Sequence, residues 1–130
     1  MENQLICLDT SVIIDFYRKT DKSNSFFYKL AKNHQHFAVS AITEYEIYTG
    51  SNPEKDIFWN EFFEKVISLP YDQKVNQTAI AIERQLKRER KQIDIPDLFI
   101  AATALTNRLP IATLNTKHFE RIQGLELISM

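Results

Sequence analysis

The sequence predicts one α/β domain spanning residues 1–130, in which a central, mostly parallel β-sheet is flanked by helices. Short apolar runs alternate with longer stretches of helical periodicity along the chain. The apolar runs are continuous, which is typical of strands buried on both faces of a parallel sheet. With 44% hydrophobic and 25% charged residues, a chain of 130 residues has the composition of a globular domain with one core.

The first half of the chain contains three predicted strands and three predicted helices. The predicted strands cover residues 5–8, 37–39 and 66–69, and the predicted helices cover residues 25–32, 41–49 and 58–64. Ser40 is a candidate N-cap of the helix over 41–49, and Gly50 is its C-terminal stop. Pro70 closes the third strand, because proline cannot donate to a strand ladder.

The second half begins with a long predicted helix over residues 72–90. Its apolar residues recur at helical spacing and are Val75, Ala79, Ile82 and Leu86. Pro96 suits the first turn of a further helix, which runs to about Asn107 with Asp94 or Ile95 near its cap. The remaining predicted elements are strands over 111–113 and 125–128 and a short helix over 117–122.

The composition excludes several kinds of site. Cys7 is the only cysteine, so neither an intrachain disulfide nor a cysteine-based zinc site is possible, and its apolar neighbours predict a buried thiol. Two glycines, Gly50 and Gly124, are too few for a Gly-rich phosphate-binding loop. A net charge of −1 excludes a purely electrostatic nucleic-acid binder, so any RNA contact must depend on local patches and metal ions.

No targeting or membrane segment is visible in the sequence. The N-terminus lacks the basic and apolar segments of a signal peptide. No run approaches the ~20 apolar residues that span a bilayer. We therefore expect a soluble cytoplasmic protein that does not contact the membrane.

Acidic residues follow the predicted strands, at the sheet edge where α/β proteins bind ligands. Asp9 closes the first strand, Glu46 lies on the helix after the second, and Asp97 opens an Ala-rich helix. The residues three, four and seven positions after Asp97 are small or apolar. Its carboxylate is therefore expected at the N-terminal end of the buried face of that helix. Glu46 similarly shares a face with Ile42 and Thr49. Acids directed inward need a cation, a donor or a metal.

A divalent cation would relieve the repulsion among three such carboxylates, since no Lys or Arg is placed in the sequence to neutralise all of them. Mg²⁺ takes oxygen ligands and could activate a water against a phosphate. A simpler interpretation stays open, because Asp9 and Asp97 could each cap a helix. Glu44 is more typical of a solvated helix residue.

Four segments carry a family resemblance. They are residues 8–15 (LDTSVIID), 39–50 (VSAITEYEIYTG), 94–104 (DIPDLFIAATA) and 111–119 (IATLNTKHF). In this order they resemble the motifs of PIN-domain nucleases, specifically the VapC toxin branch of toxin–antitoxin pairs.

The resemblance assigns roles to individual residues. Asp9, Glu46 and Asp97 match its metal-binding acids, and Glu46 is selected over Glu44 because it lies four residues before a glycine. Asn115 stands where many members carry Asp, and it can coordinate or hold a water without supplying charge. The hydroxyls of Ser11 and Thr113 are expected to support the metal-bound water or the carboxylates.

The resemblance also implies a fold, an activity and partners. It implies a Rossmann-like parallel sheet, a Mg²⁺ or Mn²⁺ cofactor, and endonucleolytic cleavage of RNA by the toxin of a type II toxin–antitoxin system. It further implies a homodimer, and inhibition by an antitoxin whose tail occupies the acidic groove. The alternative is a PIN-like module that binds a partner or RNA without cleaving, which the replacement at Asn115 leaves open. A haloacid-dehalogenase-like phosphatase is disfavoured, because Ser11 stands where its second Asp belongs.

Basic and aromatic residues offer further candidate surfaces. The densest basic cluster consists of Arg84, Lys87, Arg88, Arg90 and Lys91. It is either a solvated helix face or a contact for RNA phosphates. Aromatic residues on the early helices build core or serve dimer and antitoxin contacts. No ligand role is assigned to the three histidines, His34, His36 and His118.

Overall fold

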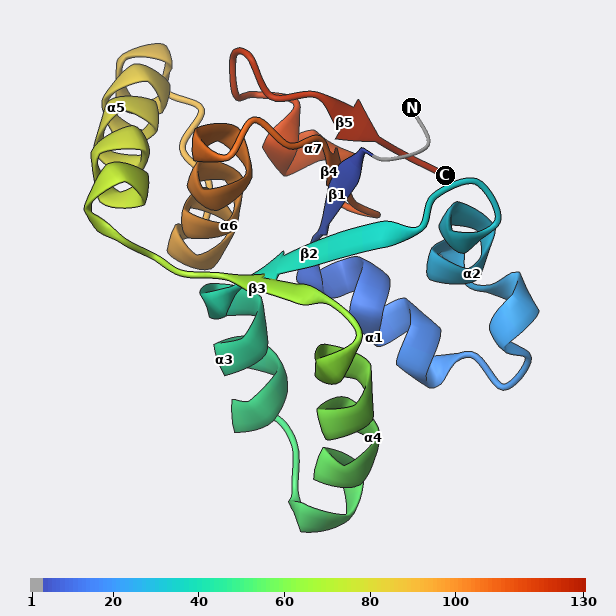
Figure 1. Cartoon of the computed structure of the whole chain (residues 1–130). Coiled ribbons are helices and arrows are strands. Elements are labelled where there is room, and N and C mark those ends of the chain that lie inside the picture. The colour runs from blue at the N-terminus through green and yellow to red at the C-terminus, as the bar shows by residue number, and fades with distance from the viewer. Residues whose placement is uncertain (1–3) are drawn as a thin grey trace.

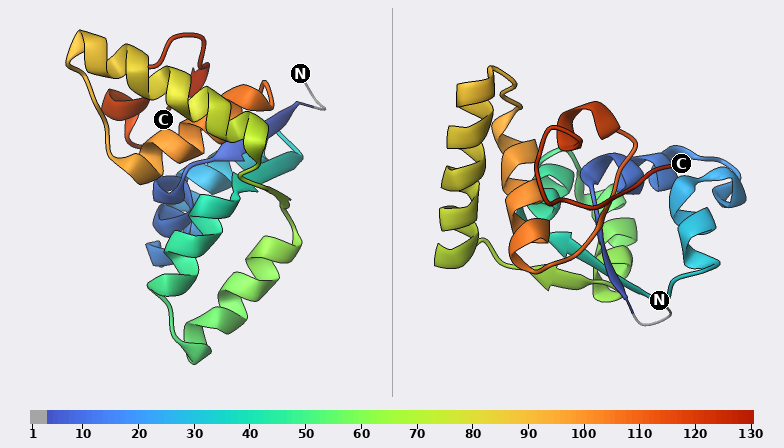
Figure 2. Two further views of the ribbon diagram at one scale, coloured as in Figure 1. Left: turned by 90° about the vertical axis from the view of Figure 1, so that its left-hand side faces the viewer. Right: turned by 90° about the horizontal axis from the view of Figure 1, so that it is seen from above.

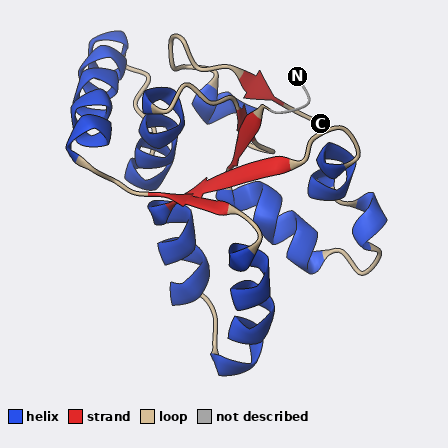
Figure 3. Cartoon of the chain, viewed as in Figure 1, coloured by secondary structure: helices blue, strands red, loops and turns tan. Residues whose placement is uncertain are grey.

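The computed structural model describes residues 4–130 and confirms an α/β fold with a parallel central sheet flanked by helices (Figures 1 and 3). The strands are β1 (Leu5–Leu8), β2 (His36–Ser40), β3 (Ile67–Leu69), β4 (Ile111–Ala112) and β5 (Leu127–Ile128). They lie in the order β3-β2-β1-β4-β5, and every neighbouring pair is parallel. Cys7 at the centre of the sheet pairs with Ala38 on one side and Ile111 on the other.

Helices cover both faces of the sheet, so its strands are buried apolar runs. One face carries α1 (Thr10–Arg18), α2 (Phe26–Ala31) and α4 (Pro53–Glu64), and the other carries α5 (Gln73–Glu89), α6 (Ile95–Thr106) and α7 (Thr116–Phe119). Ile6 and Leu8 point into the core beneath α1, whereas Cys7 between them points into the core beneath α6. The buried thiol is thus confirmed, and burial raises its pKa to about 12.

Two helices differ from the sequence prediction. No helix is predicted from the sequence over α1, because the β-branched run Val12-Ile13-Ile14 favours a strand locally. Burial of Val12 and Ile13 against the sheet overrides that preference. The helix predicted over 58–64 begins earlier, at Pro53, because Asn52 Oδ1 accepts a cap bond from Lys55 N (3.0 Å) and proline suits the first turn.

The remaining elements lie close to their predicted positions. Helix α3 (Ala41–Thr49) has the predicted bounds, with Ser40 Oγ accepting from Thr43 N (3.1 Å) and Gly50 at its end. Asp94 is the N-cap residue of α6. Strand β5 and helix α7 are shorter than predicted. Figure 2 shows α3 and α4 side by side, projecting from the sheet, with α5 lying against α6.

The chain order creates a topological switch point beside β1. After β1 the chain adds β2 and β3 on one side, and it later returns to add β4 and β5 on the other. The connections that leave the carboxyl ends of β1 and β4 therefore run to opposite sides at this edge of the sheet, where open α/β folds bind ligands. Asp9 follows β1 and Thr113 follows β4 at this edge. Among the helices of residues 4–130, none is long and apolar enough to cross a membrane.

Candidate active site

Asp9 is held by hydroxyl groups at the switch point rather than by its helix. It occupies the N-cap position of α1, yet its side chain makes no cap hydrogen bond, so the capping interpretation is wrong. Its carboxylate Oδ2 instead accepts from Ser11 Oγ (2.7 Å) and Thr113 Oγ1 (2.9 Å). Only 3% of the residue is exposed. The two hydroxyls thus orient a buried carboxylate, as expected of Ser11 and Thr113.

The same two hydroxyls fix the loop after β4. Ser11 Oγ accepts from Leu114 N (3.1 Å), and Thr113 Oγ1 accepts from Asn115 N (2.8 Å). Each hydroxyl therefore donates its proton to Asp9 and receives a backbone proton from the 114–115 segment. The backbone N–H of Asp9 adds a third link between the two segments, since it donates to Ala112 O at the end of β4 (3.0 Å). The start of α1 and the end of β4 form one rigid unit.

Glu46 reaches the same region from α3. Its Oε1 accepts from Thr10 Oγ1 (2.8 Å), and Thr43 Oγ1 lies 3.1 Å from the same hydroxyl. Thr10 directly follows Asp9, so this bond brings the Glu46 carboxylate to the start of α1. Thr10 was not a predicted site residue, and its role depends on a contact across 36 positions. Glu44 instead accepts a hydrogen bond from Ser68 on β3 and stays outside the group.

Asp97 enters the site from the first turn of α6. Its carboxylate Oδ2 lies 2.7 Å from His118 Nδ1 on α7, and the two side chains are 20% and 31% exposed, respectively. Asn115 Nδ2 lies 3.0 Å from the same ring nitrogen. Sequence reasoning missed His118, and the spacing of three positions from Asn115 on a short helix is the one signal that connects it to the site.

Burial and mutual repulsion disfavour the charged forms of Asp9 and Glu46. Burial raises the pKa of Asp9, while the Ser11 and Thr113 hydrogen bonds lower it and the charge of Asp97 raises it. Burial also raises the pKa of Glu46, the Thr10 hydrogen bond lowers it, and Asp97 and Asp9 raise it further. Within residues 4–130 neither Lys nor Arg forms an ion pair with any of the three. The site therefore favours positive charge.

The donor set fits a hydrated divalent ion better than a closed metal centre. Within the described part of the chain, no three His, Cys, Asp or Glu side chains lie close enough to hold an ion by themselves. Mg²⁺ needs no such cage, because it usually keeps several waters and binds through one or two carboxylates plus a substrate phosphate. A structural zinc site would need four nitrogen or sulfur ligands.

We expect Asp9 to make the metal-free protein less stable as pH rises. Its pKa in the folded state lies above the ordinary 3.8, so between these two values the folded chain binds more protons than the unfolded chain. The free energy of unfolding must then fall as pH increases through that window. Thermal unfolding in a chelator from pH 4 to pH 8 should show a weaker decline in Asp9→Asn than in the parent. Equal declines would contradict the assigned cause.

The predicted basic cluster is exposed, and among the described residues none of its side chains forms an ion pair with the three carboxylates. Arg84, Lys87 and Arg88 lie on α5, Arg90 ends that helix in a left-handed conformation (φ 56°), and Lys91 follows. Arg121 Nη1 donates to Lys91 O (3.3 Å) and Gln92 O (2.9 Å). A hollow of about 600 Å³ lies between the end of the cluster and the segment after α7 and is lined by Arg90, Lys91, Glu120 and Arg121.

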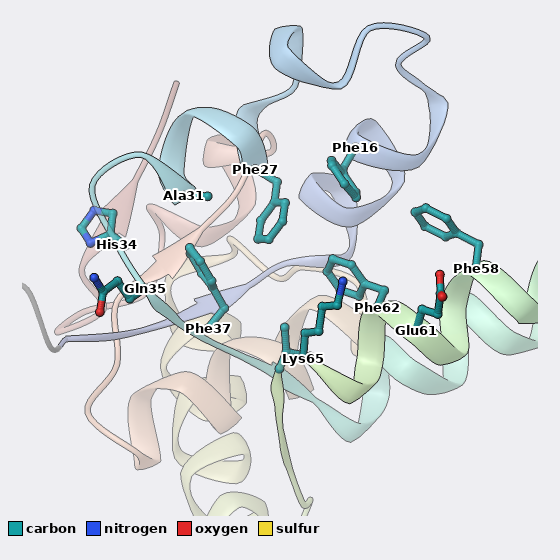
Figure 4. Close-up of a pocket in the computed structure, with 11 residues that line it drawn as sticks. Phe16, Phe27, Ala31, His34, Gln35, Phe37, Phe58, Glu61, Phe62 and Lys65 are labelled. Carbon is teal, nitrogen blue, oxygen red and sulfur yellow. The ribbon is translucent and has the colours of Figure 1, made fainter.

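An apolar groove of about 500 Å³ lies between α1, α2 and α4 (Figure 4). Phenylalanine rings from these helices and from β2 form most of its wall. His34 and Gln35 lie at one end of the groove, and Glu61 lies at the other (Figure 4). His34 Nδ1 is buried and has no hydrogen-bond partner among the described residues. None of the three site carboxylates lines this groove.

Comparison with known proteins gives consistent matches over nearly the whole chain. The model of the PIN domain matches residues 6–125. Ribonuclease VapC1 of Methanocaldococcus jannaschii is 32% identical over 127 residues, which cover 97% of this chain and 87% of the relative.

Two solved structures also match nearly the whole chain. DNA-bound VapBC from Salmonella typhimurium superposes with a TM-score of 0.83 at 25% identity, covering 99% of this chain and 98% of that chain. VapBC-1 from nontypeable Haemophilus influenzae has a TM-score of 0.81 at 26% identity, with 97% and 98% covered.

Proposed function

The chain belongs to the PIN-domain family, among the VapC ribonucleases, and from this premise we propose that it is a metal-dependent endoribonuclease and the toxin of a type II toxin–antitoxin system. The observation that carries the proposal is the placement of Asp9 directly after β1, with Glu46 bonded to the adjacent Thr10 and with the charge of Asp97 raising the pKa of both other carboxyls. RNA is the proposed substrate because the relative in Methanocaldococcus jannaschii is a ribonuclease.

The roles of the residues follow from their contacts. We propose that Asp9, Glu46 and Asp97 hold the divalent ion, with Mg²⁺ as the natural ion and Mn²⁺ as its substitute. When bound, such an ion lowers the pKa of a water molecule and offsets negative charge on the phosphate. Ser11 and Thr113 keep the Asp9 carboxylate oriented through their hydroxyl protons.

Asn115 distinguishes this site from a fully acidic one. Its side chain supplies an amide next to Asp97 and His118 but no negative charge. We propose that Asn115 holds a water or a phosphate oxygen rather than a second metal ion. The site then works with three carboxylates.

RNA digestion tests the activity directly. Purified protein should cleave RNA in Mg²⁺ and stop when EDTA is added. Glu46→Gln should lower the rate about 100-fold, because the loss of a charge that holds the ion removes several kcal/mol of transition-state stabilisation. Glu44→Gln on the same helix is the matched control and should cleave like the parent. Cleavage in EDTA, or equal rates in the two variants, would exclude the proposed chemistry.

The non-cleaving interaction module remains the second candidate. It is favoured by the neutral residue at Asn115, and it predicts RNA or partner binding without product in any divalent ion. Digestion with Mg²⁺ and with Mn²⁺ separates the two candidates, since a module yields intact RNA in both.

The basic cluster is proposed to contact RNA phosphates. All five of its residues are exposed, and none forms a salt bridge with a described acidic residue. Replacing Arg84, Lys87 and Arg88 together by Gln should flatten the dependence of RNA binding on salt by about two to three units of log–log slope. Fluorescence anisotropy at several salt concentrations measures that slope. If the slope stays unchanged, the three residues do not contact phosphate.

We propose that the cognate antitoxin docks an apolar segment in the groove of Figure 4. The solved VapBC structures support a protein partner of this kind. An exposed apolar groove lined by aromatic rings suits the buried centre of a protein interface. We also propose that the tail of the antitoxin occupies the acidic site. The protein is further proposed to form a homodimer and to act in the cytoplasm.

A further inference from the structure

We propose that His118 is a positioning residue for the Asp97 carboxylate. This inference rests on the proposed function, because it assigns to Asp97 the role of a metal ligand. It concerns a side chain that carries no predicted role and that lies in direct contact with two site residues.

The hydrogen-bond chemistry fixes the direction of the contact with Asp97. A carboxylate only accepts, so the 2.7 Å contact requires His118 Nδ1 to donate its proton to Asp97 Oδ2. A nitrogen that donates in this way cannot also accept from Asn115 at 3.0 Å. The Nδ1 proton of His118 is therefore committed to Asp97 and not shared with Asn115.

The position of His118 is set by the fold and not by its own side chain. The neighbouring Phe119 is fully buried and Ile122 is nearly so, both in the core shared with α6. Arg121 binds the carbonyls of Lys91 and Gln92, in the segment that leads directly into α6. Because α7 and the start of α6 are tied together on both sides, the imidazole is held at a fixed place opposite Asp97.

Asp97, like Glu46, has a single side-chain partner, whereas Asp9 has two. Two hydroxyls orient Asp9, and one hydroxyl orients Glu46 from within α1. In the described structure His118 is the only side chain that bonds the Asp97 carboxylate. Groups that hydrogen-bond a metal ligand typically change metal affinity 10- to 100-fold when they are lost. We therefore expect loss of His118 to weaken metal binding, although His118 is not itself a metal ligand.

Isothermal titration of the purified full chain with Mn²⁺ tests the inference. His118→Leu should weaken Mn²⁺ binding about 10- to 100-fold. His118→Asn should restore most of the affinity, because the Asn amide nitrogen takes the place of Nδ1. His118→Gln places its nitrogen where Nε2 lies and should behave like His118→Leu. The exposed His36, replaced by Leu, is the control and should bind like the parent.

The outcomes separate this inference from the proposed function. Parent-like Mn²⁺ affinity in His118→Leu, or failure of Asn to exceed Gln, would overturn the positioning role. If the Leu variant does not fold, the comparison of Asn with Gln decides alone. Asp97→Asn is measured in parallel. Unchanged Mn²⁺ binding in Asp97→Asn would contradict the proposed metal site itself, whereas loss in Asp97→Asn without loss in His118→Leu would contradict only the role of His118.

Discussion

Asp9→Asn should reduce RNA cleavage by about 1,000-fold or more while the protein stays folded. A divalent ion stabilises transition-state charge by several kcal/mol, and loss of about 4 kcal/mol corresponds to a factor of roughly 1,000. The fold should tolerate the change, since both hydroxyls bond to the same oxygen of Asp9 and the Asn oxygen can accept both protons. Because burial raises the pKa of Asp9, the neutral side chain also removes an unfavourable charge.

Rates of RNA cleavage and melting temperatures of the parent and Asp9→Asn measure the two effects together. Asp94→Asn serves as the matched control, because Asp94 is exposed and its side chain caps no backbone N–H. The control should cleave at the parental rate. If Asp9→Asn retained a tenth of the activity, the carboxylate would not hold the ion on which cleavage depends.

Ala31→Arg should weaken antitoxin binding by about 100-fold. Ala31 is exposed at the end of α2 and lines the apolar groove, so a large cation there would have to be buried without a partner when the antitoxin docks. The change should not disturb the toxin alone, since arginine favours helices and a cation is stabilised near a helix C-terminus. Affinity for the cognate antitoxin is the measurement.

Ala81→Arg on α5 provides the comparison for the groove variant. Ala81 is also exposed and helical, but it lies outside the groove. Its affinity for the antitoxin should equal that of the parent. Equal weakening in both variants would point to net charge as the cause, and no weakening in Ala31→Arg would show that the antitoxin docks elsewhere.

Local sequence patterns predicted the elements that position the site. The buried run before Asp9 and the helical stripe below Asp97 depend on neighbours a few positions away, so their periodicity predicts both. Helix α1 was harder to predict from local sequence, because burial against the sheet outweighs the strand preference of Val12, Ile13 and Ile14. Its packing partners are distant in sequence.

The side chains that bond to the three carboxylates also divide into those predicted from the sequence and those that were not. Ser11 and Thr113 were predicted from the motifs that contain them, and both bond to Asp9. The contacts of Thr10 with Glu46 and of His118 with Asp97 span 36 and 21 positions. No spacing rule within one helix or strand reaches that far. Such contacts exist only once the sheet has brought α1, α3, α6 and α7 to one edge.

The anomalous signal of Mn²⁺ in a crystal of the protein tests the central claim most directly. We expect one strong peak at the carboxyl ends of β1 and β4, within coordination reach of Asp9 and Asp97 directly or through water, and with Glu46 facing it. A peak elsewhere, or no peak at saturating Mn²⁺ in a crystal form that leaves this edge open, would contradict the claim that these three carboxylates form a metal site.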